Sequence, residues 1–160
     1  MIFLTVGTQF PFDRLVRAVD DIVEEGLITE TVFGQVGQGG CRPRNFESVA
    51  CLDKEAFDQF VRQASRMIGH AGMGTITVAL NNHKPLLMLP RLKKYHEVVN
   101  DHQVAIARRL SELGHVLAVH DVEDLRDGVR RLETFVPKER KAAPHAVAER
   151  IQRFLDGLQD

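Results

Sequence analysis

The chain has 160 residues, 44% hydrophobic and 27% charged, which is typical of a single globular domain. Its 21 lysines and arginines against 22 aspartates and glutamates give a formal net charge of −1, which argues against a nucleic-acid partner. Two cysteines without metal-ligand spacing, no basic leader and no apolar run near the roughly 20 residues that span a bilayer predict a cytoplasmic chain without a zinc site.

Short apolar runs, typical of buried strands, alternate along the chain with segments in which apolar residues recur at helical spacing. In chain order we expect a strand at 2–6, a helix at 15–23, strands at 30–35 and 48–50, a helix at 56–64 after the N-cap Asp53, a strand at 67–68, a helix at 74–80, a strand at 85–89, a helix at 99–113, a strand at 116–119, and helices at 122–132 and 144–158. This order predicts an α/β fold over residues 1–160, a Rossmann-like doubly wound parallel sheet of about six strands.

The segment Gly69–Thr75 places three glycines and a histidine between a strand and a helix. In a doubly wound sheet, ligands bind beyond the carboxyl ends of the strands. Gly72 and Gly74 lack a Cβ, so a ligand can approach the backbone, and the helix start offers unpaired N–H groups to an anion. His70 and Thr75 add side-chain donors. The segment predicts an anion site; the structural alternative is that the glycines only permit close packing and that His70 is satisfied within the fold.

A second polar cluster, Asp101, His102 and Gln103, stands at the start of another expected helix. A carboxylate, an imidazole and an amide together suit a ligand with several hydroxyl groups, although an N-cap with solvated neighbours is the structural alternative. The preceding segment His96–Asn100 lacks the second histidine of the metalloprotease HExxH pattern, so we predict no zinc there. The glycine spacing around His70 likewise matches neither GxGxxG nor a P-loop.

Three segments together carry a family resemblance: Leu4-Thr-Val-Gly-Thr8, His70-Ala-Gly-Met-Gly-Thr75 and Asn100-Asp-His-Gln103. They resemble the C-terminal, donor-binding half of GT-B glycosyltransferases of family 28. The chain is most similar to the small single-domain subunits of split UDP-sugar transferases, which serve N-glycan precursor synthesis in eukaryotes and exopolysaccharide or capsule synthesis in bacteria. The resemblance implies one GT-B half-domain and an inverting transfer that needs neither a cofactor nor a bound metal.

The resemblance also implies residue roles. His70 would be the catalytic residue, and the diphosphate and sugar of the UDP-sugar donor would be held by Gly7, Thr8, Gly72, Gly74, Thr75, Asp101, His102 and Gln103. Many relatives hold the ribose with an acidic residue at the position of Val78, so Thr77 or a backbone group would have to substitute. Which sugar is carried stays open among glucuronate, galactose, glucose and N-acetylglucosamine. Arg91, Lys93 or Lys94 could pair with a uronate carboxylate, or simply form a solvated basic loop.

A single half-domain lacks the acceptor half of a GT-B enzyme. The resemblance therefore implies a membrane-anchored, acceptor-binding partner subunit that brings a lipid-linked saccharide acceptor and the general base, and that holds this chain peripherally at the inner face of the membrane. The apolar stripe of the helix expected at 144–158 either docks that partner or packs on this chain's own sheet. Two other functions remain: a non-catalytic nucleotide-sugar-binding regulatory module, and a nucleotide-sugar epimerase or dehydrogenase, against which the missing GxGxxG argues.

Overall fold

A computed structural model describes residues 1–139 of the chain, so the helix expected at 144–158 lies outside the described residues. Within them the strands are β1 (Ile2–Thr5), β2 (Val32–Gln35), β3 (Glu47–Val49), β4 (Arg66–His70), β5 (Leu86–Leu89) and β6 (Leu117–Ala118). The helices are α1 (Asp13–Glu24), α2 (Lys54–Gln63), α3 (Met73–Asn81), the 3-10 turn η1 (Lys93–Tyr95), α4 (His102–Glu112) and α5 (Leu125–Thr134). In residues 1–139 no helix is both long and apolar enough to cross a membrane.

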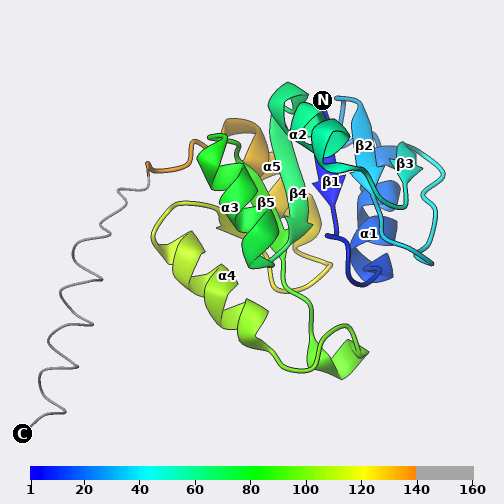
Figure 1. Cartoon of the computed structure of the whole chain (residues 1–160). Helices are drawn as coiled ribbons and strands as arrows, with labels where there is room; N and C mark the ends of the chain where they lie inside the picture. Colours follow the sequence, from blue (N-terminus) through cyan, green and yellow to red (C-terminus); the bar gives the residue numbers. More distant parts are fainter. Residues whose placement is uncertain (140–160) are drawn as a thin grey trace, which may run out of the picture.

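The six strands form one parallel sheet in the order β3-β2-β1-β4-β5-β6 (Figure 1), which confirms the predicted doubly wound fold. Chain connections run outward from β1 to one edge and then from β4 to the other, so the order reverses between β1 and β4. Thr5, at the end of β1, is in register with Gln35 of β2 and Gly69 of β4. The carboxyl ends of these three strands are therefore level, and the turns after them open at the point where such sheets bind ligands.

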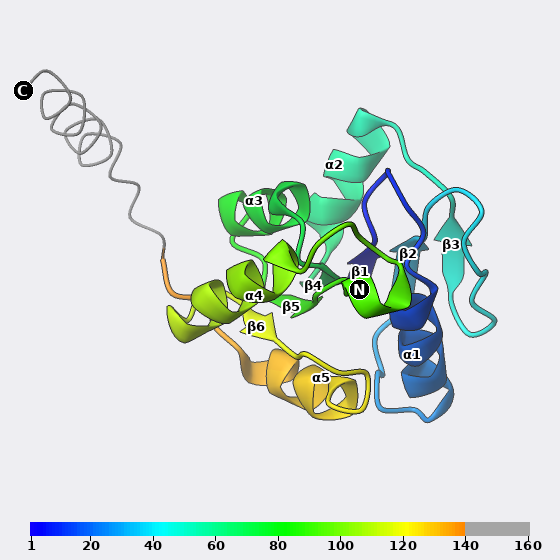
Figure 2. The ribbon, with the colours of Figure 1, turned by 90° about the horizontal axis from the view of Figure 1, so that it is seen from below.

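Helices cover both faces of the sheet: α1 and α5 lie on one face, and α2, α3 and α4 on the other (Figures 1 and 2). Successive residues of β1 face opposite layers, so Leu4 packs with α1 while Phe3 packs with the side chains of α2. Both side chains are fully buried. A parallel sheet covered on both faces needs strands that are apolar throughout, which is why apolar runs rather than alternation marked the strands in the sequence.

Two helix boundaries test the sequence predictions. The Asp53 carboxylate accepts the N–H of Ala56 at 2.8 Å, which confirms the predicted N-cap of α2. The helix expected from residue 99 begins only at His102, so that start was wrong. The backbone before it is held differently, because Glu97 accepts the N–H of Leu92 and the residues between form a loop. Side-chain hydrogen bonds of this kind compete with helix formation.

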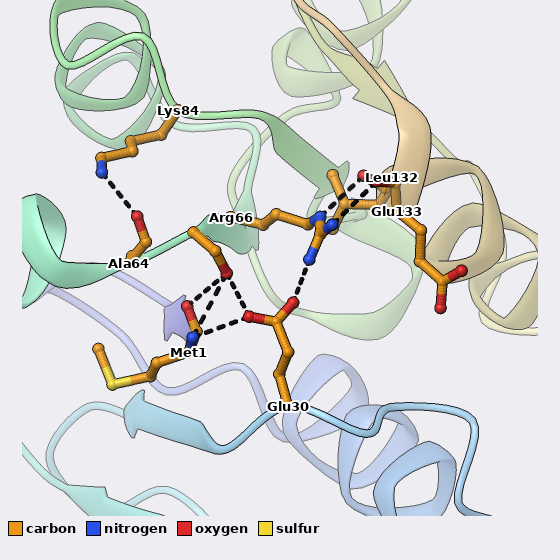
Figure 3. Close-up of polar contacts among 8 residues, drawn as sticks. Met1, Glu30, Ala64, Arg66, Lys84, Leu132 and Glu133 are labelled. Carbon is orange, nitrogen blue, oxygen red and sulfur yellow. Dashed lines mark hydrogen bonds and ion pairs between the residues drawn. The ribbon is translucent and has the colours of Figure 1, made fainter.

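At the amino-terminal edge of the sheet, polar contacts tie β1, β4 and α5 together (Figure 3). The carboxylate of Glu30 pairs with the Met1 amine at 2.8 Å and with the Arg66 guanidinium. Arg66 also donates to two carbonyls at the end of α5, and Lys84 donates to the Ala64 carbonyl at the end of α2. The polar groups at this edge of the sheet are thus largely occupied with one another.

Candidate functional site

A cavity of about 730 Å³ opens at the carboxyl edge of the sheet, beside the reversal between β1 and β4. Its walls come from the turn after β1, the end of β2, the start of α2, the turn between β4 and α3, and the loop before α4. The predicted site residues that line it are Gly7, Thr8, His70, Gly72, Gly74, Thr75, His102 and Gln103. The fold therefore brings together residues that lie up to almost one hundred positions apart in the sequence.

His70 is the last residue of β4, and its imidazole lies between two glycines. A Cβ at Gly72 would stand 2.1 Å from Nε2 of the ring, and a Cβ at Gly7, whose φ is +81°, would stand 2.9 Å from Cε1. Nδ1 lies 3.4 Å from the Thr75 hydroxyl. Gly72 thus meets a packing requirement, as the structural alternative proposed for the glycines of this turn, and Gly7, which that alternative did not include, meets one on the other side of the ring.

Burial and, to a smaller extent, the positive charge of nearby Arg91 lower the pKa of His70 from 6.5 to about 4, although a hydrogen bond to the Thr5 backbone opposes the shift. The ring is therefore neutral at pH 7. A neutral imidazole carries one N–H donor and one acceptor nitrogen, so it can donate a hydrogen bond to an anion only when that N–H is not held by the Thr5 backbone.

Gly74 differs from Gly7 and Gly72 in its surroundings. A Cβ at this position would meet no heavy atom within 4 Å, so packing within the described chain does not require glycine there. The N-cap of α3 is Gly72, which makes no side-chain cap, and the first residues of the helix line the cavity. The first-turn N–H groups lack partners within the helix, and they and the positive end of the helix dipole can bind an anion.

The cluster before α4 is divided by the fold. Gln103 is buried, and its Oε1 accepts the N–H of Arg91 at 3.2 Å. His102 lines the cavity with its ring against the Asn100 side chain. Asp101 lies outside the cavity lining, and its carboxylate accepts the N–H of Lys93 at 2.7 Å. His102 and Gln103 therefore line the cavity, whereas Asp101 holds the loop before α4 through the backbone of Lys93.

Several side chains in the cavity wall were not among the predicted site residues, and the buried polar side chains of Gln35 and Arg91 are two of them. Gln35 is buried at the end of β2; its amide donates to the Thr5 hydroxyl and the Gly7 carbonyl, both at 3.2 Å, and accepts the N–H of Leu52. Arg91 belongs to a basic run that was expected either to meet a uronate or to be solvated, yet it is buried. The signal was present in the sequence, since a polar residue at the end of a buried parallel strand, as Gln35 is, or shortly after it, as Arg91 is, lies at the ligand-binding edge.

The positions of Val78 and Thr77 on α3 bear on how the ribose could be bound without an acidic residue at position 78. Val78 lines the cavity, whereas Thr77 lines a separate groove with Leu80 and Asn81. The Thr77 hydroxyl is therefore not placed to replace an acidic side chain at position 78. Among residues 1–139, no three histidine, cysteine, aspartate or glutamate side chains gather where a metal ion could be held.

A family model described as "Glycosyltransferase family 28 C-terminal domain" matches residues 1–158. The chain is 34% identical over 123 residues to the mouse protein "UDP-N-acetylglucosamine transferase subunit ALG13", covering 71% of this chain and 10% of that protein. It is 31% identical over 104 residues to the subunit of the same name from Cryptococcus neoformans, covering 64% of this chain and 50% of that one. The chain thus spans between a tenth and a half of these relatives.

Solved structures share the fold. The glycotransferase of kitacinnamycin matches with a TM-score of 0.61 at 21% identity, covering 83% of this chain and 34% of that one. An NMR solution structure of ALG13 matches with a TM-score of 0.59 at 20% identity, covering 94% of this chain and 93% of that one. At these identities the likeness concerns the arrangement of strands and helices.

Proposed function

We propose that the chain, which belongs to the family of glycosyltransferase family 28 C-terminal domains, is the donor-binding subunit of a two-component enzyme. This enzyme is an inverting glycosyltransferase that uses a UDP-sugar. One observation carries the proposal: the start of α3 at Gly74 is open to a cavity at the sheet reversal, beside the neutral imidazole of His70. In the reaction the acceptor hydroxyl attacks the anomeric carbon, and the bond from that carbon to the diphosphate breaks. The helix start and His70 stabilise the charge that the diphosphate gains.

The helix start alone is too weak to hold the donor. A helix terminus contributes at most about 2 kcal/mol to an anion, whereas micromolar affinity requires about 8 kcal/mol. The rest must come from the base and the sugar. The apolar side chains of Leu52, Phe57 and Val78 line the same cavity and suit an aromatic base, while His102 and Gln103 suit sugar hydroxyls.

The relatives' names bear on the sugar and the partner. Each is called a subunit of a UDP-N-acetylglucosamine transferase, which favours N-acetylglucosamine over glucuronate, galactose or glucose. The word subunit favours a second chain, for which we propose a membrane-anchored protein that binds a lipid-linked saccharide. The general base then belongs to that partner, and this chain lies at the inner face of the membrane through it. An exopolysaccharide precursor is the alternative acceptor.

The test compares His70→Ala with His120→Ala, a histidine outside the cavity lining. Both variants are assayed for fold by circular dichroism and, with the partner subunit, for transfer from a panel of UDP-sugars. We expect His70→Ala to keep the fold and abolish transfer, while His120→Ala transfers normally. Full activity of folded His70→Ala would contradict the proposal, and UDP-sugar binding without transfer in any pair would instead support the regulatory module.

A further inference from the structure

The turn between β1 and α1 is fastened by one side chain from the far half of the sheet. The guanidinium of Arg91, which follows β5, donates to the carbonyls of Val6 at 2.9 Å, Phe10 at 2.7 Å and Pro11 at 2.7 Å. Only 3% of Arg91 is exposed, and its Cζ lies 4.6 Å from the centre of the Phe12 ring. A single cation thus bridges both ends of the loop.

Within residues 1–139 the charge of Arg91 has no carboxylate of its own, because the attraction of Glu97 is opposed by the repulsion of Arg14. Glu97 is bound by Arg14 through two hydrogen bonds of 2.9 Å. Arg14 and Glu97 cancel each other, so this group of three side chains keeps one positive charge. A buried charge without a counter-charge is costly, and carbonyl dipoles compensate it only in part. Arg91 lines the cavity, where an anionic ligand would supply the missing charge.

The fastened loop is also the one that packs on His70. Gly7 stands against the imidazole, and its carbonyl accepts a hydrogen bond from Gln35 on the side of β2. The loop is therefore held from β2 by Gln35 and from β5 by Arg91. Release of either side would let Gly7 move and free the ring of His70 from its place.

We propose that Arg91 is a positioning residue of the diphosphate site: it holds the loop from Val6 to Pro11 against His70 and leaves an unneutralised positive charge in the cavity wall for the diphosphate. This inference rests on the proposed donor site and names the side chain that makes the site selective for charge. Arginine suits the role because its planar fork reaches three carbonyls at once, which the single ammonium of lysine cannot reproduce.

The experiment measures the affinities of uridine, uridine monophosphate and uridine diphosphate by calorimetry for wild type, Arg91→Met, Arg91→Lys and Lys94→Met. Lys94→Met is the matched control, because it removes an exposed positive charge from the same segment after β5 in which Arg91 lies. We expect Arg91→Met to weaken the diphosphate about tenfold, the monophosphate less and uridine hardly at all, since only the charged ligands lose a Coulomb interaction. Arg91→Lys should retain most of this preference, and Lys94→Met should behave as wild type.

Hydrogen exchange of the Gly7 and Thr8 amides tests the clamp without any ligand. Both Arg91 variants should exchange faster there than wild type, at unchanged rates in β4. The inference would be overturned if Arg91→Met bound all three ligands more weakly by the same factor, or if its amides exchanged as in wild type. The proposed function would still stand in that case, provided that the wild type binds uridine diphosphate. Failure of the wild type to bind any of the three would instead defeat the proposed function itself.

Discussion

Replacement of Gly74 by alanine separates what the helix start does for the fold from what it does for a ligand. The added methyl group meets no heavy atom within 4 Å, so the folded chain accepts it without strain. Alanine is the better helix former by about 0.5 to 1 kcal/mol in a helix interior, and near the start of α3 we expect about 0.5 kcal/mol. For a domain of this size that corresponds to a Tm higher by about 1 to 2 °C.

The same methyl group projects into the space where we place the diphosphate. It would keep the anion from the first-turn N–H groups, a contact worth up to about 2 kcal/mol, so affinity for uridine diphosphate should fall by up to about thirtyfold. Stability and binding therefore move in opposite directions. Calorimetric titration and thermal unfolding of the same samples measure both.

Asn81→Ala is the matched control, because Asn81 is exposed at the other end of α3 and the change also replaces a weaker helix former by alanine. It should leave the affinity for uridine diphosphate unchanged. If Gly74→Ala binds uridine diphosphate as tightly as wild type, the anion does not lie on the start of α3 and the reasoning fails.

Two further predictions concern pH. The pKa of His70 falls from 6.5 to about 4 on folding, so the unfolded chain binds more protons than the folded chain between these pH values. His70 should therefore cost up to about 3 kcal/mol of stability as the pH falls from 6.5 to 4. In urea unfolding, His70→Gln should show a flatter dependence of stability on pH. Burial alone would raise the pKa of Glu30, but hydrogen bonds from the Met1 amine and Ser65 outweigh it and lower that pKa. Glu30→Gln should therefore lose about 1 kcal/mol of stability at pH 7, and this deficit should disappear as the pH falls below 4.5. Glu133→Gln, whose carboxylate points away from this cluster in Figure 3, should unfold as wild type at both pH values.

The sequence by itself determined the order of strands and helices, because buried parallel strands are apolar throughout and helices repeat their apolar residues every three to four positions. It also located the turn at Gly69–Thr75, since glycines between a buried strand and a helix have few other uses. The N-cap at Asp53 followed from local chemistry in the same way, as did the end of α4 at Gly114, whose φ is +77°.

Only the tertiary structure decided where the individual side chains lie and which atoms they contact. Glycines that look alike in the sequence separated into Gly72, required by the imidazole, and Gly74, open to the cavity, because the difference lies in which atoms stand opposite each Cα. Arg91 looked like part of an exposed basic run, and its burial depends on carbonyls some eighty residues earlier that meet it only when β1 and β5 lie in one sheet. Contacts across such separations leave no local pattern, because they are made by side chains whose neighbours the fold alone selects.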